Sequence, residues 1–372
     1  MNTALFEPFG LGALTVPNRI VMAPMSRARA AADGTPTTLM ATYYAQRATA
    51  GLIIAESAHV SPAGRIGPGA PGLHTRAHEY GWSRIADAVH DRGGRIFVQL
   101  AHAGRLAHPD FLPDGLYPVA PSPKTAQASI FTPYGRQPAV SPHEMTGNQI
   151  RTVIEDFVRA ARRAVAAGLD GVEIHAANGY LLHQFLADNP NTRTDRWGAT
   201  PEGRTRLTVE TVRAVAAAIG PDRVGLRISP RDGYGDLREP LAHRTYPALL
   251  RALARDRIAY LHLTETADNA LDDRLRELWP TALMVTPRAA DSADITKERA
   301  ALAWLRRGAD LVAFGRGFLT NPDFVTRLRT GARLNTPQDV GLYGGDHRGY
   351  TDYPTLDGLT SRDVTPAPAR TP

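Results

Sequence analysis

Short apolar segments that alternate with segments of helical periodicity are the feature that most limits how this chain can fold. We predict strands at residues 19–24, 51–60, 95–100, 171–175, 224–229, 259–264, 282–285 and 310–314. We predict helices at residues 37–50, 75–92, 149–167, 201–219, 244–256, 297–307 and 322–330. This alternation indicates a parallel sheet, and eight such units over roughly 300 residues predict an α/β fold, the (β/α)8 TIM barrel.

Segments outside this repeat predict additions to the barrel. Residues 6–16 turn around glycines and indicate a small N-terminal hairpin. Residues 101–148 follow the third strand, are rich in Pro, Ser, Gly and His, and contain no long periodic segment. A connection of that length usually forms a lid or a binding element, so we expect a capping insertion over the barrel. We predict a single domain at 1–360, with the insertion at 101–148, followed by a disordered tail at 361–372.

The composition excludes several classes of protein. The chain has no cysteine, which excludes disulfides, iron–sulfur clusters, cysteine-ligated zinc and thiol catalysis. We predict no metal site, and His102 and His108 of the insertion are expected at the surface. The formal charge of +6 comes from scattered arginines, so neither nucleic acid nor a membrane is an expected partner. The N-terminus lacks the features of a signal peptide, and the expectation is a cytoplasmic monomer or homodimer.

The segment with the strongest chemical signal is residues 171–186, GVEIHAANGYLLHQFL. His175 and Asn178 come just past a predicted strand end, where two donors can point at one oxygen atom, and Tyr180 can supply a proton nearby. Each of these residues alone is more often structural. Their grouping at the C-terminal end of a barrel strand, where barrel enzymes carry their chemistry, favours a catalytic role.

Other polar residues reach the same predicted end of the barrel. Gln99 and Arg227 can hydrogen-bond a planar ring that is rich in heteroatoms. Gly315 and Arg316 follow the eighth strand, where such barrels often bind phosphate. Ser26 follows the first strand. The set favours a phosphorylated planar cofactor over a metal ion.

At several motifs the chain resembles the Old Yellow Enzyme family of FMN-dependent ene-reductases, which are also NADPH dehydrogenases. The matching segments are residues 22–27 (MAPMSR), 98–105 (VQLAHAGR), 175–186 (HAANGYLLHQFL), 191–197 (NTRTDRW), 227–230 (RISP), 314–322 (FGRGFLTNP) and 342–354 (LYGGDHRGYTDYP). They occur in order over nearly the whole chain, and the last segment resembles the classical subgroup of the family.

This resemblance implies roles for individual residues. Tyr180 would be the proton donor, and His175 and Asn178 would hold the carbonyl oxygen of the substrate. Tyr343 falls where the family places an aromatic residue over the substrate. The residues that would bind FMN are Pro24, Met25, Ser26, Ala58, Gln99, Arg227, Gly315 and Arg316.

Two positions depart from the family pattern. Ala101 stands where many members carry Trp, which should enlarge the substrate pocket. Pro287 stands in the turn after the seventh strand, whose amides usually bind phosphate in this family, and proline has no N–H to offer. Arg288 would then compensate as a charged phosphate ligand, or it is simply exposed.

Together these features predict a ping-pong reaction. NADPH or NADH would reduce bound FMN, and an α,β-unsaturated carbonyl, nitro or imide compound would then be reduced at its C=C bond. Two other interpretations stay open. One is a dedicated biosynthetic flavin oxidoreductase or isomerase that acts on one metabolite, which Ala101 and the long insertion motivate. The other is a non-catalytic barrel that has lost FMN, which Pro287 motivates.

Overall fold

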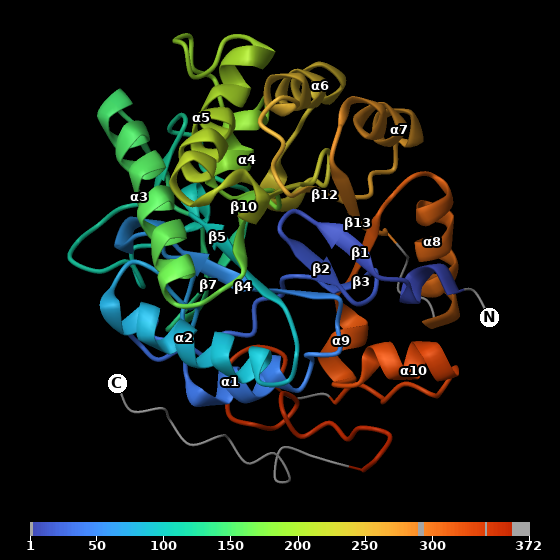
Figure 1. Ribbon diagram of the computed structural model, residues 1–372. Coiled ribbons are helices and arrows are strands. Elements are labelled where there is room, and N and C mark those ends of the chain that lie inside the picture. Colours follow the sequence, from blue (N-terminus) through green and yellow to red (C-terminus); the bar gives the residue numbers. More distant parts are fainter. Residues whose placement is uncertain (1–2, 289–293, 339–340, 359–372) are drawn as a thin grey trace.

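Eight parallel strands close into a barrel, and helices surround it (Figure 1). The computed structural model describes residues 3–288, 294–338 and 341–358. The barrel strands are β3 (Ile20–Met22), β4 (Leu52–His59), β5 (Ile96–Ala101), β10 (Gly171–Ala176), β11 (Val224–Ile228), β12 (Tyr260–Thr264), β13 (Ala282–Thr286) and β14 (Leu311–Phe314). β14 pairs with β3 and closes the ring. The predicted TIM barrel is confirmed, and the predicted tail at 361–372 lies outside the described residues.

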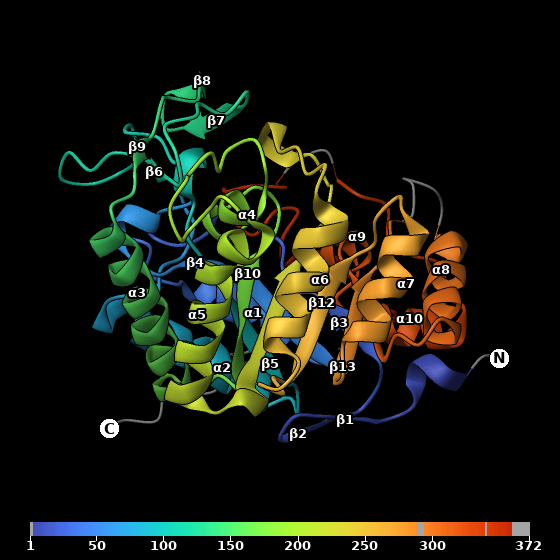
Figure 2. The same cartoon turned by 90° about the horizontal axis from the view of Figure 1, so that it is seen from above.

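The helices follow the strands and cover the outside of the barrel (Figures 1 and 2). They are α1 (Thr38–Ala45), α2 (Arg76–His90), α3 (Gly147–Ala166), α4 (Leu181–Leu186), α5 (Pro201–Ile219), α6 (Ala242–Leu253), α7 (Asn269–Leu278), α8 (Asp294–Arg306), α9 (Arg316–Thr320) and α10 (Phe324–Thr330). Short 3-10 turns lie at η1 (Thr3–Phe6), η2 (Pro62–Gly64), η3 (Gly104–Leu106), η4 (Pro221–Arg223) and η5 (Tyr234–Asp236).

Local sequence explains which helices were predictable. α5 begins and ends as predicted, because Pro201 suits its first turn and the side chain of Thr200 accepts a 3.0 Å hydrogen bond from the Gly203 amide. Three helices, α4, α7 and α9, are absent from the prediction. α4 and α9 are too short to show a periodicity. In α7 the buried apolar residues are Leu271 and Leu275, which lie among charged residues.

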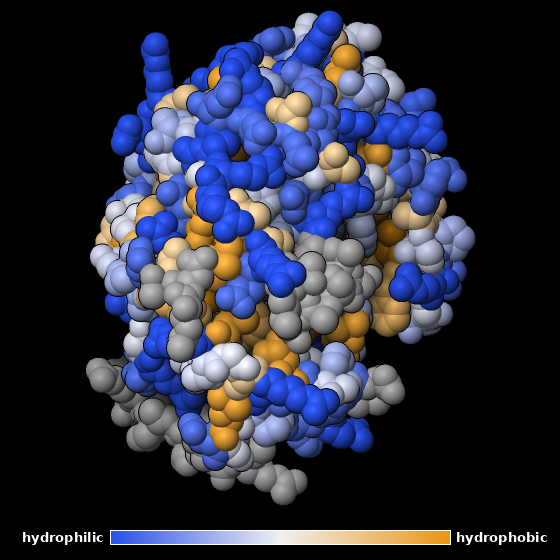
Figure 3. All heavy atoms as spheres, turned by 90° about the vertical axis from the view of Figure 1, so that its right-hand side faces the viewer, coloured by the Kyte–Doolittle hydropathy of each residue, from blue (hydrophilic) through white to orange (hydrophobic). Residues whose placement is uncertain are grey.

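One face of the molecule is mostly hydrophilic, and its apolar residues show in patches between polar ones (Figure 3). Within the described ranges, no helix combines the length and the apolar content that crossing a bilayer requires.

The predicted N-terminal hairpin seals one end of the barrel. β1 (Phe9–Leu11) and β2 (Leu14–Val16) pair antiparallel. Leu11 and Val16 are fully buried in a cluster with Leu52 and Leu311, the first residues of β4 and β14. The hairpin therefore packs where the strands begin, and the opposite end, where they finish, is the mouth of the barrel.

The capping insertion has a small core of its own. Within it, β6 (Val119–Ala120) pairs with β9 (His143–Glu144), and β7 (Ser129–Thr132) pairs with β8 (Gly135–Pro138). These strands project from one side of the barrel in Figure 2. The core consists of the buried residues Ala103, Leu106, Ala107, Phe111, Leu112, Ala126 and Ile130. The expectation of two surface histidines is wrong, because the insertion folds back over His102 (2% exposed) and His108 (8% exposed).

The C-terminal segment, residues 341–358, returns to the loop after β3, and Arg27 holds it there. In Figure 1 this red segment runs beside α1. The buried guanidinium of Arg27 donates at 2.9–3.0 Å to three carbonyl oxygens of the segment, those of Gly341, Leu342 and Gly349. It also donates to the Tyr43 hydroxyl at 2.9 Å, and the Gly344 amide donates back to the Arg27 carbonyl at 2.9 Å. One buried side chain thus joins two ends of the sequence.

We expect the Arg27→Ala variant to release the C-terminal segment, because several buried acceptors lose their donor at once. The free energy of unfolding should fall by roughly 3 kcal/mol or more, and limited proteolysis should cut within residues 341–358. Urea titration and mass spectrometry of the fragments measure both effects. Arg92→Ala, at an exposed position after α2, is the control. Equal stability and equal protease resistance in Arg27→Ala would contradict this account of the segment.

Three histidines gather beside the start of α2. The ring centroids of His59 and His74 lie 5.3 Å apart, and those of His74 and His78 lie 4.5 Å apart. Gly72 makes room for them, since a Cβ there would lie 2.5 Å from the His78 ring. Burial, followed by repulsion from its neighbours, lowers the pKa of His59 well below its ordinary value and that of His74 to about 4; burial also lowers the pKa of His78.

We expect this cluster to make the protein sensitive to acid. Below pH ~6.5 the histidines of the unfolded chain bind protons, whereas those of the folded cluster, with their lowered pKa values, stay neutral. The free energy of unfolding therefore falls between pH ~6.5 and ~4, at up to about 1.4 kcal/mol per pH unit for each histidine. In His74→Gln the loss of unfolding free energy between pH 7 and pH 5 should shrink by up to about 2 kcal/mol. Urea titrations at both pH values test this, with exposed His143→Gln as control. An unchanged loss in His74→Gln would refute it.

Candidate active site

The barrel register brings the predicted site residues together at the mouth. His175 of β10 lies opposite Arg227 of β11, and Glu173 of β10 lies opposite Gln99 of β5. Because parallel strands finish at the same end, side chains from distant parts of the sequence meet there.

A chain of hydrogen bonds crosses the interior of the barrel below this mouth. Ser57 Oγ donates to Gln99 Oε1, and Gln99 Nε2 donates to Glu173 Oε1 at 2.7 Å. The other Glu173 oxygen lies 2.7 Å from His262 Nδ1, and His262 Nε2 lies 2.7 Å from Thr286 Oγ1. A carboxylate only accepts, so Nδ1 of His262 carries the proton and Nε2 accepts from the threonine. The chain joins five strand residues and fixes the side chain of Gln99.

The charges in this interior are compensated. Burial raises the pKa of Glu173, but the interactions with His262, Arg227 and Gln99 together outweigh this and leave the pKa below its ordinary value. Burial lowers the pKa of His262 by more than Glu173 raises it, so His262 is neutral. Arg227 is buried beside them, and Glu173 opposes the lowering of its pKa by burial. The barrel interior therefore holds the carboxylate of Glu173 and the guanidinium of Arg227, which have opposite charges, together with the neutral imidazole of His262.

His175 is a buried and neutral side chain. It is 3% exposed, and its Nδ1 has no hydrogen-bond partner within the described residues. Burial, and then the charge of Arg227, lower the pKa of His175 well below its ordinary value. Its ring meets that of Tyr180 edge-on, with 5.0 Å between centroids. A neutral imidazole can donate one hydrogen bond without carrying charge.

Asn178 stands at the turn between β10 and α4. Its φ is +49°, in the left-handed region that few residues other than glycine adopt. The Asn178 amide donates to Ser229 Oγ at 2.8 Å, and Asn178 Nδ2 donates to Asp232 Oδ2 at 2.9 Å. The residues after β11 thus hold both the backbone and the side chain of Asn178.

Tyr180 is a protonated phenol between the barrel and the insertion. Its ring packs against the core of the capping insertion. Burial, and then Tyr234 and Tyr343, raise the pKa of Tyr180 far above its ordinary value. Tyr343 itself is 67% exposed and belongs to the C-terminal segment. The predicted substrate aromatic is thus near enough to the predicted proton donor to affect its pKa.

The other predicted cofactor residues come from several loops and strands of the barrel. Pro24, Met25 and Ser26 form the loop after β3, and Met25 Sδ lies 3.3 Å from where a Cβ on Gly315 would stand. Ala58 is fully buried in β4.

The predicted phosphate ligands lie in two places, the turn after β13 and the start of α9. The side chain of Arg288 is exposed, and its backbone amide donates to Glu265 Oε2 at 2.6 Å. Arg316 begins α9 and is exposed. The amide of Arg288 is therefore already used by a carboxylate, and its guanidinium is the group that remains for phosphate.

The donor set fits FMN. Arg227 Nε is buried and has no partner within the described residues, which suits an acceptor of a bound ring. Gln99 is held in one orientation by Ser57 and Glu173, and Gly315 and Arg316 supply a small residue and a cation at the start of α9. Planar heteroatoms and a phosphate are the groups that such donors bind.

Sequence reasoning missed the residues that support this set. Glu173, His262, Ser57, Ser229 and Asp232 were not among the candidates. A signal existed for two of them, because a charged residue inside Val172–Ile174 and a histidine inside β12 interrupt apolar strands. For Asp232 there was none, since its contact with Asn178 spans 54 residues.

Comparisons with known proteins agree with this geometry. Residues 4–335 match the profile of the FMN-binding NADH:flavin oxidoreductase / NADH oxidase family. The chain is 37% identical to flavin oxidoreductase hxnT of Emericella nidulans, over 94% of this chain and 97% of that protein. It is 38% identical to 12-oxophytodienoate reductase 7 of Oryza sativa subsp. japonica, over 96% of each.

Solved structures share the fold over nearly their whole length. The Old Yellow Enzyme homologue from Zymomonas mobilis is 37% identical, with a TM-score of 0.90, and the match covers 95% of this chain and 100% of that one. Morphinone reductase in complex with tetrahydroNAD is 41% identical, with a TM-score of 0.90, over 96% and 98% of the two chains. From profile, relatives and barrel together, the chain belongs to the NADH:flavin oxidoreductase / NADH oxidase family and is an FMN-dependent oxidoreductase of the Old Yellow Enzyme type.

Proposed function

We propose that this protein reduces the activated C=C bond of α,β-unsaturated carbonyl, nitro or imide compounds in a ping-pong reaction with NADPH or NADH. The observation that carries the proposal is the meeting of a neutral His175, Asn178 and a protonated Tyr180 at the mouth, beside the buried Arg227. Relatives named for the reduction of an oxophytodienoate and of morphinone support it.

The residues that would hold FMN are those predicted from the sequence. Gln99 and Arg227 would bind the ring from the barrel interior, with Pro24, Met25, Ser26 and Ala58 along it. Gly315, Arg316 and Arg288 would bind the phosphate. Once bound there, FMN would supply the redox chemistry, the transfer of hydride from the nicotinamide to the β-carbon of the substrate.

His175 and Asn178 would stabilise the charge that develops on the substrate oxygen. A neutral His175 offers an N–H without bringing a second cation next to Arg227, and the side-chain amide of Asn178 offers another. Preorganised donors of this kind each lower the barrier by roughly 3–4 kcal/mol. Because Asp232 holds the side chain of Asn178, and His175 is buried with its ring against Tyr180, little reorganisation is needed as the charge forms.

Tyr180 would protonate the α-carbon. Its raised pKa keeps the phenol protonated throughout the neutral range, as a general acid requires. The insertion that packs on Tyr180 also keeps water away from the reacting atoms.

The proposal also covers the size of the substrate, the domain organisation, the location and the oligomeric state. Ala101 is fully buried at the end of β5 and would leave room for a bulky substrate, with Tyr343 as the exposed aromatic over it. The proposal also includes a single domain at 1–360, which the continuous barrel supports, together with a cytoplasmic location and a monomer or homodimer.

The visible spectrum of the purified protein tests the proposal directly. A yellow protein should bleach on anaerobic addition of NADPH and regain its colour with cyclohexenone, and the product should be cyclohexanone. A colourless protein that FMN does not reconstitute would contradict the proposed activity. Bleaching without recovery by enones, nitroalkenes or maleimides would contradict the proposed substrate class.

Tyr180→Phe should separate the two half-reactions. Removing the hydroxyl takes away the proton donor and leaves the ring, so reduction of the flavin by NADPH should change by less than about twofold, while reoxidation by cyclohexenone should slow by ~10²–10⁴. Stopped-flow absorbance measures both. Tyr134→Phe, at an exposed tyrosine of the insertion, is the matched control. An equal loss in both half-reactions would remove Tyr180 from the mechanism.

A further inference from the structure

We propose that Asp232 is a positioning residue that fixes the side chain of Asn178 for its contact with the substrate oxygen. The inference rests on the proposed function, in which Asn178 grips that oxygen. Asp232 lies in the loop between β11 and α6 and belongs to none of the motifs recognised in the sequence.

The first support is a closed ring of hydrogen bonds. The Asn178 amide donates to Ser229 Oγ at 2.8 Å, and Ser229 Oγ donates to Asp232 Oδ2 at 2.5 Å. The same oxygen accepts from Asn178 Nδ2 at 2.9 Å and so closes the ring. Ser229 is fully buried, so water does not compete for its hydroxyl. Backbone and side chain of Asn178 are therefore fixed together by two residues.

The ring explains how Asn178 keeps an unfavourable backbone conformation. A non-glycine residue at φ +49° costs free energy and persists where its surroundings determine it. From the other side, the next amide, that of Gly179, donates to His183 Nδ1 at 3.1 Å. The turn that carries Asn178 is thus held on both sides.

A carboxylate suits position 232 better than any neutral group. Oδ2 accepts from Ser229 and Asn178, and Oδ1 accepts from the Tyr234 amide at 2.9 Å. An amide in this place would direct an N–H at one of these donors. Because a carboxylate only accepts, the nitrogen of Asn178 must face it. One N–H of Asn178 is then used, and the second is left with a fixed direction.

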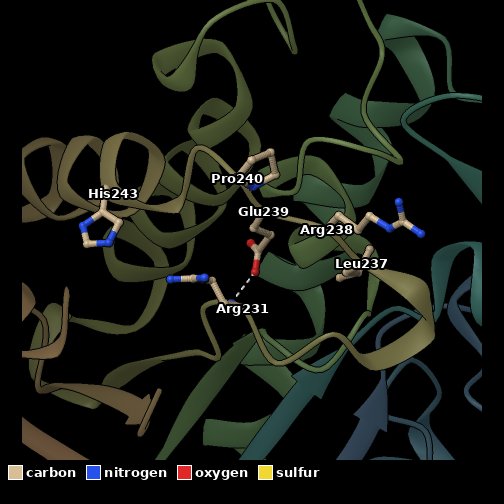
Figure 4. Close-up of a pocket in the computed structure, with 6 residues that line it drawn as sticks. All are labelled: Arg231, Leu237, Arg238, Glu239, Pro240 and His243. Carbon is tan, nitrogen blue, oxygen red and sulfur yellow. Dashed lines mark hydrogen bonds between the residues drawn. The ribbon is translucent and has the colours of Figure 1, made fainter. Parts of the chain in front are cut away.

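The loop that carries Asp232 is anchored on its outer side. The Arg231 amide donates to Glu239 Oε2 at 2.5 Å, the contact drawn in Figure 4. Glu239 is buried, and its other oxygen accepts from the Tyr246 hydroxyl at 2.6 Å. These contacts border a pocket of about 430 Å³ lined by Arg231, Leu237, Arg238, Glu239, Pro240 and His243. Asp232 is therefore held by the fold and can in turn hold Asn178.

A double-mutant cycle on the holoenzyme tests the inference. The probe is p-chlorophenol, whose phenolate mimics the enolate oxygen, and the readout is its dissociation constant from titration of the flavin spectrum. Asn178→Ala and Asp232→Ala should each weaken binding, by about tenfold and at least about fivefold. The double variant should bind no more weakly than Asn178→Ala, because Asp232 acts through Asn178. In a His175→Ala background, Asp232→Ala should keep its full effect.

Controls separate positioning from general damage. Asp256→Ala removes a carboxylate that pairs with Arg213 on the outer helices and should leave the constant unchanged. Asp232→Asn, the milder variant, should weaken binding less than Asp232→Ala and retain the flavin. Independent effects of Asp232→Ala and Asn178→Ala would overturn the inference, as would unchanged binding in Asp232→Ala. If Asn178→Ala alone binds the phenol normally, the assigned role of Asn178 fails, and the inference fails with it.

Discussion

The buried carboxylate of Glu173 is the constraint on which the rest of the site depends. A charge inside a barrel is costly unless it is paired and hydrogen-bonded, and here each oxygen has a partner from a neighbouring part of the barrel. Those partners, Gln99 and His262, are fixed by the same need, and Arg227 supplies the opposite charge. The interior therefore determines which way the proposed flavin ligands face before any ligand binds.

Around this interior, the local environment of each titratable group determines its pKa and so its protonation state. Burial next to the positive charge of Arg227 keeps His175 neutral, and burial against the insertion keeps Tyr180 protonated. The mouth thus holds donors of three kinds, a cation, a neutral imidazole and a phenol, and each retains its state across the neutral range. This division agrees with a reaction in which negative charge appears on an oxygen and a proton is then delivered to carbon.

The sequence was sufficient to predict the barrel, but it did not single out Glu173, His262 and Ser57 among the residues of its strands. Apolar strands, the capped helix α5 and the motif around His175 are local signals, and the structure confirms the elements they predicted. The roles of the candidate site residues stay predictions. What local signals could not supply depends on contacts across long separations. His102 and His108 are buried because the insertion forms its own core, and Asp232 meets Asn178 from another strand-to-helix loop. Helix α7 was not predicted because its apolar residues are too few to form a helical pattern.

The attachment of the C-terminal segment to Arg27 has a consequence for how the protein is made. The three carbonyl acceptors for this guanidinium lie 314 to 322 residues further along the chain. During synthesis the barrel strands emerge in order. The guanidinium of Arg27, just after the first strand, gains its carbonyl acceptors only when the last segment has emerged. This part of the mouth is therefore completed last, and a chain that stops short of residue 341 leaves the buried guanidinium with the Tyr43 hydroxyl but none of its three carbonyl acceptors from the C-terminal segment. The loop after β3 can therefore take its final structure only after the C-terminal segment has been synthesised.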